Sequence, residues 1–329
     1  MPAPRRRRRC VVPVVLALLM LVLAGCGSPS TASLAGASTA PAGTATAGAT
    51  QAIPPGSSTQ TITVDGATRT FHLYRPASLA GSAPLVVMLH GGYGTGRQAE
   101  KFYGWDTEAE RGHFLVAYPD GLNRAWNVDG GGCCGKPARN NVDDVAFLTH
   151  MITTIEHETP IDPRRIYATG ISNGGIMTYT LACKTQIFAA IGPDSATDLA
   201  DCPSPAPISL IHIHGTADLR IPSNGGPGHN RDVTIDGPAV PTLNATWRRI
   251  DHCATPTITT VGVVTTSAAT CPDHRGVELI AIAGAGHQWP GAQPHVVAQK
   301  LLNSDPPSTA INATTVIWQF FATHPIATR

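Results

Sequence analysis

The sequence contains little charge of either sign. Only 14% of its 329 residues are Asp, Glu, Lys or Arg, and the formal net charge is +1 at pH 7. Five of the basic residues form one run, Arg5 to Arg9, and the chain without that run has a net charge near −4. Proteins that bind nucleic acid through its phosphates need an excess of Lys and Arg. The composition therefore excludes nucleic acid as an expected partner.

The chain also lacks a metal-binding pattern. It contains 8 cysteines and 13 histidines, but Cys133 and Cys134 are adjacent, which is not the C-x-x-C spacing of a structural zinc site. The histidines show no spacing typical of metal ligands either. We therefore expect neither a metal ion nor another cofactor.

Residues 1–25 have the pattern of an export signal. A basic stretch, Arg5 to Arg9, precedes the apolar run Val11 to Leu23, which is too short for a comfortable membrane span. Leu23-Ala24-Gly25-Cys26 then matches a bacterial lipobox, in which Cys26 is lipidated and becomes the mature N-terminus. The pattern predicts a lipoprotein anchored to the outer face of the cell membrane. The alternative is a plain secretory signal with an incidental cysteine.

Residues 26–59 are expected to form a disordered tether. From Gly27 to about Thr59 the chain is mostly Ser, Thr, Ala, Gly and Pro and carries no charged residue. Such a segment cannot bury enough apolar surface to offset the entropy of ordering it. Residues 60–329 have a suitable length for one catalytic domain.

The most informative motif is G-x-S-x-G at Gly170 to Gly174. It follows the apolar run Arg165 to Thr169 and precedes a helical stretch, Gly175 to Cys183. A sharp turn between a strand and a helix exposes the serine hydroxyl, and glycine is needed on both sides because a side chain would clash with the flanking helix and strand. The motif predicts Ser172 as a nucleophile.

Two later loops supply an acid and a base in the chain order of a hydrolase triad. Asp218 follows a predicted strand at 207–213, and His287 follows another at 277–282. A serine hydroxyl needs a neutral histidine to remove its proton, and that histidine needs a carboxylate to orient it. Asp194, after the apolar residues 188–191, is the alternative acid, although the H-G-T-x-D setting favours Asp218.

A fourth loop predicts the oxyanion hole. The apolar run 84–89 is followed by His90-Gly91-Gly92-Tyr93-Gly94. In this type of site, one backbone N–H comes from such a loop and the second from the residue after the nucleophile. We expect Gly92 or Tyr93 to provide the first donor and Asn173 the second.

Taken together, these motifs resemble one known family. H-G-G after a strand, G-x-S-N-G-G, H-G-T-x-D-x-x-x-P and G-x-G-H-x-W-P-G are similar to the polyhydroxybutyrate depolymerase and feruloyl esterase group of α/β-hydrolases (carbohydrate esterase family 1-like), as is the stretch from Trp126 to Gly135. The resemblance covers about residues 60–325. It implies a secreted serine esterase for polyesters, for feruloyl or acetyl groups on polysaccharides, or for small esters. An acyltransferase to a cell-envelope sugar and a catalytically degenerate surface-binding lipoprotein are the alternatives.

The coarse secondary structure agrees with an α/β-hydrolase fold. Residues 61–64 and 70–74 flank Asp65-Gly66 and predict an antiparallel hairpin. Helices are expected at 142–158, 240–251 and 310–321. Strands that alternate with helices predict a mostly parallel sheet covered by helices on both faces.

Some residues have two interpretations. Local spacing suggests the disulfides Cys253–Cys271 and Cys183–Cys202, which leaves Cys133 and Cys134 to form a vicinal bridge or to share partners with the others. Trp126, Trp289 and Tyr93 either line the ester pocket or pack against the core. For the histidines near the site other than His287, we expect a structural role; they are His90, His212 and His214.

Overall fold

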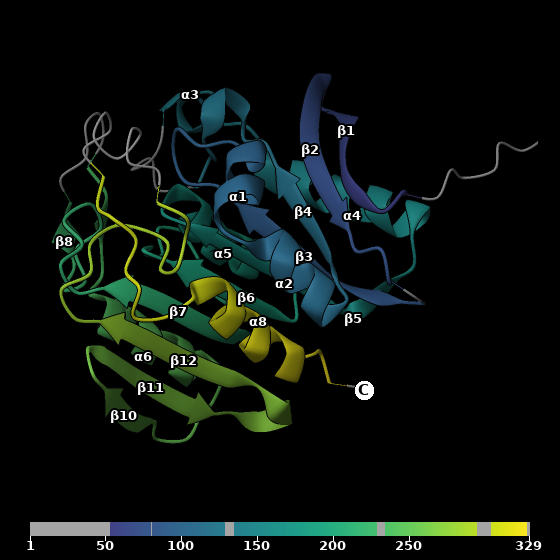
Figure 1. The fold of residues 1–329 in the computed structure, drawn as a ribbon. Coiled ribbons are helices and arrows are strands. Elements are labelled where there is room, and N and C mark those ends of the chain that lie inside the picture. The colour runs from purple at the N-terminus through teal and green to yellow at the C-terminus, as the bar shows by residue number, and fades with distance from the viewer. Residues whose placement is uncertain (1–52, 80, 129–134, 229–233, 295–303, 328–329) are drawn as a thin grey trace, which may run out of the picture. The chain divides into compact units, whose positions relative to one another are not determined.

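The computed structural model describes residues 53–79, 81–128, 135–228, 234–294 and 304–327. Within them, ten strands form one sheet in the order β1-β2-β4-β3-β5-β6-β7-β12-β11-β10 (Figure 1). The strands are β1 (Gly56–Val64), β2 (Ala67–Arg75), β3 (Ala83–Leu89), β4 (Leu115–Pro119), β5 (Ile161–Ile171), β6 (Ala190–Asp194), β7 (Ser209–Gly215), β10 (Thr257–Val261), β11 (Val264–Thr270) and β12 (Gly276–Ile282). A separate two-stranded sheet pairs β8 (Gly226–Pro227) with β9 (Asp236–Gly237).

The centre of the sheet is parallel and its two ends are antiparallel. Parallel pairing runs through β4, β3, β5, β6, β7 and β12, whereas β1, β2, β11 and β10 pair antiparallel. Every residue of β3, β4, β6 and β7 is buried. Strands buried on both faces favour near-continuous apolar runs, as β3 and β4 have, whereas β7 buries two histidines among its apolar residues.

Helices cover both faces of the sheet (Figure 1). The helices are α1 (Gly96–Phe102), α2 (Trp105–Gly112), α3 (Gly135–Arg139), α4 (Asp144–Glu158), α5 (Asn173–Lys184), α6 (Val240–Ile250) and α8 (Ala313–Thr323), with short 3-10 turns at Leu122–Arg124 and Pro272–His274. Side chains of α4, α5 and α6 form one core cluster, and those of α1, α2 and α8 form another on the opposite face. No helix of the described residues is long and apolar enough to span a membrane.

The predicted fold class is confirmed, and some boundaries shift. The opening hairpin forms with Val64 opposite Ala67, and Asp65 and Gly66 both take positive φ at the turn. However, β1 begins at Gly56, inside the segment expected to be a tether, because residues 56–64 pair along the whole of β2. Residues 26–52 lie outside the described residues.

Two helices start later than the sequence pattern indicates, because each has its own capping residue. The Asp143 side chain accepts a hydrogen bond from the Ala146 N–H at the start of α4. Asn312 does the same for the Thr315 N–H at the start of α8. A side chain that caps the first turn satisfies one of the free N–H groups there. The helix then begins at the next residue.

Both disulfides suggested by local spacing are present. Cys183 is bonded to Cys202 and Cys253 to Cys271, across sequence separations of 19 and 18 residues. The first joins the end of α5 to the loop after β6, and the second joins the loop after α6 to the residue before a 3-10 turn. Cys133 and Cys134 lie outside the described residues.

The two disulfides should contribute similarly to stability, because they close loops of nearly equal length. We expect the double variant Cys183→Ser/Cys202→Ser to lower the free energy of unfolding by roughly 3 kcal/mol, chiefly through the larger entropy of the unfolded chain. Cys253→Ser/Cys271→Ser should have a comparable effect. Urea unfolding of the oxidised proteins measures both, and an unchanged midpoint in either double variant would contradict this expectation.

Candidate active site

Four polar residues lie at the carboxyl ends of four neighbouring strands. Ser172 follows β5 directly, Asp194 ends β6, Asp218 follows β7, and His287 follows β12. These strands are adjacent in the sheet and parallel, and Ile171 pairs with Asp194. The loops after parallel strands meet at one edge, so the fold brings Ser172 and the loops of Asp218 and His287 to the same edge of the sheet.

Ser172 occupies a strained turn between β5 and α5. Its φ of 57° and ψ of −123° are unfavourable for a residue with a side chain, and its N–H donates to the Asp194 carbonyl at 3.0 Å. A Cβ on Gly170 would lie 2.7 Å from the Leu89 carbonyl oxygen, and one on Gly174 would lie 2.3 Å from the same atom. Glycine is therefore required on both sides of the serine for the steric reason that the motif implies.

His287 and Asp218 form a short hydrogen bond. His287 Nδ1 lies 2.7 Å from Asp218 Oδ2. The other carboxylate oxygen accepts from the backbone N–H groups of Arg220 and Ile221 at 2.8 and 2.9 Å. Burial alone would raise the pKa of Asp218, but the nearby His287 and these donors outweigh it and lower the pKa. An ionised Asp218 accepts a hydrogen bond from the Nδ1–H of His287, which keeps the proton on Nδ1 and leaves the Nε2 lone pair free to act as a base.

Asp194 has a different environment. It is fully buried, and burial raises the pKa of its carboxyl well above the ordinary value, with a further increase from the nearby charge of Asp218. A carboxylic acid that stays protonated is a poor partner for an imidazolium. The geometry and the charge therefore favour Asp218 over Asp194 as the residue that orients His287, as the H-G-T-x-D setting suggests.

Asp305 also contacts the histidine loop, which the sequence does not indicate. Its Oδ2 accepts the backbone N–H of His287 at 2.7 Å. A Cβ on Gly286 would lie 2.2 Å from the same oxygen, so that glycine makes room for the carboxylate. In the described part of the chain, no hydrogen bond joins Ser172 Oγ to His287 Nε2. Contacts between a nucleophile and its base are often long without substrate and shorten when it binds.

Of the two alternatives for the first oxyanion donor, Tyr93 is not supported by the structure. The backbone N–H of Tyr93 donates to the Arg124 carbonyl at 2.7 Å, so it is not available to a substrate oxygen. Gly92 is then the remaining candidate in this loop. Gly91 lies against the nucleophile, because a Cβ built on it would be 3.4 Å from Ser172 Cβ. The second expected donor, the N–H of Asn173, is in the first turn of α5, where backbone N–H groups have no helical partner.

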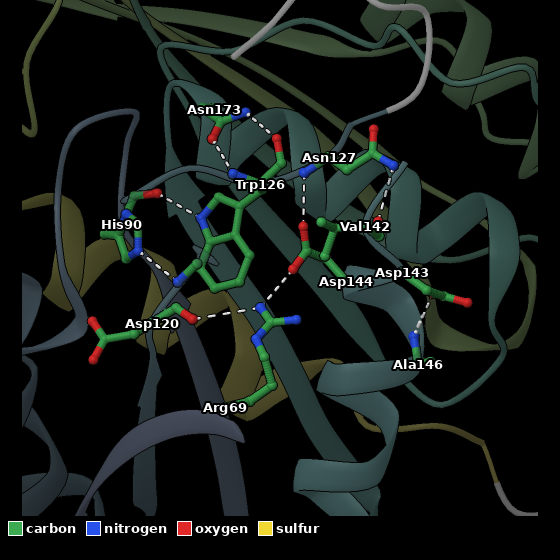
Figure 2. A network of polar contacts seen from close by, with 11 residues as sticks. Arg69, His90, Asp120, Trp126, Asn127, Val142, Asp143, Asp144, Ala146 and Asn173 are labelled. Atoms are coloured by element: carbon green, nitrogen blue, oxygen red, sulfur yellow. Dashed lines mark hydrogen bonds and ion pairs between the residues drawn. The ribbon is translucent and has the colours of Figure 1, made fainter. Parts of the chain in front are cut away.

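A buried network ties the oxyanion loop to the nucleophile turn (Figure 2). The Asn173 side chain accepts from the Trp126 N–H at 2.7 Å and donates to the Trp126 carbonyl at 3.1 Å. The Trp126 indole N–H donates to the His90 carbonyl at 2.8 Å, and His90 Nε2 accepts from the Gly121 N–H at 3.0 Å. Trp126 thus links Asn173, the residue after Ser172, with His90 at the start of the loop after β3.

The ion pair between Arg69 and Asp144 supports the same network at Asn127 (Figure 2). Arg69 Nη2 donates to Asp144 Oδ1 at 2.6 Å, and the Asn127 N–H donates to Asp144 Oδ2 at 2.7 Å. The side chains of Arg69 and Asp144 are only 2% and 0% exposed, and the guanidinium lies 3.8 Å from the centre of the Phe147 ring. Asp144 therefore holds the chain segment of Trp126 and Asn127 in place.

The pocket role considered for the two tryptophans is contradicted. Trp126 is 0% and Trp289 1% exposed, so neither reaches a substrate from the described surface. Trp289 stacks on Tyr103 at 5.2 Å between ring centres and donates its indole N–H to Thr314. Large rings are most stable where they are enclosed and the N–H has a partner, which both sites provide. Tyr93, in contrast, is 53% exposed.

The described residues hold no group of three or more His, Cys, Asp or Glu side chains that could bind a metal ion. A strained serine between a strand and a helix, on a mostly parallel sheet covered on both faces, defines the α/β-hydrolase fold.

Comparisons with known proteins agree with this class. No family model matches the chain. The chain is 29% identical over 231 residues to feruloyl esterase B of Piromyces equi. The match covers 64% of this chain and 41% of that protein. It is 30% identical over 159 residues to the bifunctional acetylxylan esterase/xylanase XynS20E of Neocallimastix patriciarum. This match covers 46% of this chain and 22% of that protein. The chain thus spans less than half the length of these two relatives.

A solved structure supports the fold. The acetyl xylan esterase from Aspergillus awamori matches with a TM-score of 0.54 and 17% identity, over 74% of this chain and 97% of that one. At this identity the match shows the α/β-hydrolase fold. With the sequence similarities, it confirms the resemblance to feruloyl esterase-like α/β-hydrolases.

The Arg69–Asp144 ion pair should be essential for stability. We expect Arg69→Met to lower the free energy of unfolding by about 3–5 kcal/mol, because it leaves the buried Asp144 carboxylate without its cation. The matched control is Arg111→Met, which removes a 62% exposed arginine from its pair with Glu108 and should cost about 1 kcal/mol or less. Denaturant unfolding measures both, and equal effects would show that the buried pair is not special.

Proposed function

We propose that this protein is a serine hydrolase of carboxylic esters that works through an acyl-enzyme. Ser172 is the nucleophile, His287 is the general base and then the general acid, and Asp218 orients His287. The observation that carries this proposal is the 2.7 Å contact between His287 Nδ1 and Asp218 Oδ2, at the sheet edge where Ser172 occupies its strained turn. The similarity to proteins named as esterases supports it independently.

Each step of the proposed reaction has a residue assigned to it. His287 Nε2 takes the Ser172 proton while Oγ bonds to the ester carbon, and the carbonyl electron pair moves onto oxygen. The backbone N–H groups of Gly92 and Asn173 stabilise that oxyanion. The bond to the alcohol then breaks, and the alcohol leaves with the proton from His287. In the second half of the reaction, His287 takes a proton from water while the water oxygen bonds to the acyl carbon. The bond to Ser172 Oγ then breaks, Oγ receives that proton, and the acid is released.

The substrate class that the similarities favour is an acyl ester of a sugar polymer. One relative is named as a feruloyl esterase and another as an acetylxylan esterase/xylanase. We infer that this chain acts on acetyl or feruloyl groups of this kind. The polyester substrates implied by the wider resemblance are the runner-up, and a comparison of rates on acetylated xylan, a feruloyl ester and a short hydroxybutyrate oligomer separates the three.

We further propose that the enzyme works outside the cytoplasm as a lipoprotein. The support is the sequence of residues 1–26, with its basic start, short apolar run and lipobox cysteine. Two disulfides in the catalytic part are consistent with an oxidising compartment.

Substitution of the three proposed catalytic residues should separate their roles. On p-nitrophenyl acetate, Ser172→Ala and His287→Ala should each lower kcat by about 10⁶-fold. Asp218→Asn should lower kcat by about 10⁴-fold, because the variant disturbs the orientation of His287 but keeps both reacting groups. Asp194→Asn, a matched change in the neighbouring loop, should cost far less. If Asp194→Asn is crippling while Asp218→Asn is silent, the acid is misassigned.

The lipid anchor can be tested in a bacterial host that is fed labelled palmitate. The full chain should incorporate the label and sediment with membranes, because a thioether-linked lipid replaces the signal at Cys26. Cys26→Ser should incorporate none. Equal incorporation in both proteins, or a mature N-terminus at another residue, would contradict the proposal.

A further inference from the structure

A chain of buried side chains leads away from Asp218 into the protein, and the proposed mechanism does not use it. His212 and His214 are two residues apart on β7, so both point to the same face of the sheet. They are 0% and 1% exposed. Tyr179 reaches them from α5 and is also fully buried. Three buried polar side chains in contact with one another require a reason, because burial of a polar group costs free energy unless it is hydrogen-bonded.

The contacts form one continuous line. The Tyr179 hydroxyl lies 2.8 Å from His212 Nδ1, and His212 Nε2 lies 3.0 Å from His214 Nδ1. His214 Nε2 is 2.9 Å from the carbonyl oxygen of Ile221 and 3.6 Å from Asp218 Oδ2. The line therefore ends on the loop that carries Asp218.

The end of the line at Ile221 fixes the direction of every proton. A carbonyl oxygen can only accept, so His214 Nε2 carries a hydrogen and donates to Ile221. Neutral His214 then has a bare Nδ1, which must accept from His212 Nε2–H. The bare Nδ1 of His212 in turn accepts from the Tyr179 hydroxyl. All three hydrogens point toward Asp218.

Both histidines stay neutral, as this assignment requires. Burial lowers the pKa of His212 well below its ordinary value, and the neighbouring His214 adds to the effect. Burial also lowers the pKa of His214, although Asp218 and the Ile221 carbonyl oppose it. The direction of the line is therefore the same across the neutral pH range.

We propose that Tyr179, His212 and His214 form a polarised hydrogen-bond chain that positions the Asp218 carboxylate and, through it, His287. The effect of the chain on catalysis rests on the proposed function, whereas the hydrogen-bond chain itself does not. Ile221 links the two halves of the argument, because its carbonyl accepts from His214 while its N–H donates to Asp218 Oδ1 at 2.9 Å. The chain thus fixes the loop that holds the acid, and its N–H dipoles present their positive ends to the carboxylate.

The charged groups around the chain determine the expected pH effect. Asp218 and His287 face its near end, Asp194 lies close to Asp218, and Asp198 lies near Tyr179. Loss of the Tyr179 hydroxyl weakens the positive end of the chain at Asp218, so the carboxylate depends more on His287 to compensate its charge. The acid limb of kcat/KM should then move to higher pH.

The first test needs no activity. Nitrogen NMR of the full-length protein labelled with ¹⁵N-histidine reports which ring nitrogen of each histidine carries the proton. We expect Nε2–H and bare Nδ1 for both His212 and His214, unchanged between pH 6 and pH 8. An Nδ1–H form of either histidine reverses the direction of the chain and overturns the proposal.

The second test uses a matched pair of variants. Tyr179→Phe removes the hydroxyl that starts the chain, and Tyr167→Phe removes another buried hydroxyl, one with no hydrogen bond within the described residues. Tyr179→Phe should lower kcat by roughly three- to ten-fold, the rate equivalent of one net hydrogen bond, with KM unchanged and the acid limb at higher pH. Tyr167→Phe should change none of these. Identical profiles for the two variants would contradict a positioning role.

A third variant pair tests the contact with the Asp218 loop. His214→Leu should lose more than ten-fold in kcat, whereas His214→Gln keeps an N–H donor at the same depth and should recover most of it. If His214→Gln is no more active than His214→Leu, with both folded by circular dichroism, the role of the Nε2–H is contradicted. If the wild type hydrolyses no ester, the proposed function fails, and the NMR test alone decides whether the polarised chain exists.

Discussion

The close approach of the nucleophile turn to the end of β3 is the constraint on which the rest of the site depends. Gly174 lies so near the carbonyl oxygens of Leu89 and His90 that a Cβ would be 2.3 and 2.6 Å from them. This contact places Ser172 beside the loop that we propose to provide an oxyanion donor. Any wider spacing would separate the hydroxyl from that donor. The strained backbone of Ser172 therefore accompanies the close approach between the ends of β5 and β3.

Two polar networks hold the loops on either side of this joint. On one side, Asn173, Trp126 and His90 connect the first turn of α5 to the oxyanion loop. On the other, the chain that starts at Tyr179 leads to the Asp218 loop through β7. Both are buried, and in each of these contacts a donor meets an acceptor. Rigid support of this kind is what electrostatic stabilisation of a transition state needs, since misplaced dipoles lose most of their effect.

The sequence predicts much of this arrangement because its signals are local. A glycine-flanked serine after an apolar run, a hairpin turn and closely spaced cysteines each depend on neighbouring residues, and the structure agrees with all three. The antiparallel edge of β10 and β11 has no such signal, because β10 is exposed, β11 is mostly half-buried, and neither shows apolar periodicity. The order of strands in the sheet is likewise set by long-range packing.

The roles of single side chains were harder to predict, because they depend on partners far along the chain. Whether Trp126 lines a pocket or packs inside is decided by Asn173 and His90, 47 and 36 residues away. The Tyr93 N–H is used by a carbonyl at residue 124, which no motif marks. In the same way, the histidines of β7 acquire a defined proton direction only through Tyr179 and Ile221.

The most direct test of the central claim is to trap the acyl-enzyme. The full-length protein is mixed with p-nitrophenyl acetate, quenched in acid within the first turnover, digested and analysed by mass spectrometry. The account predicts one acetyl group on the peptide that contains Ser172, and none on that peptide in Ser172→Ala. Rapid ester hydrolysis with an unmodified Ser172 peptide, or with the label on another residue, would contradict it.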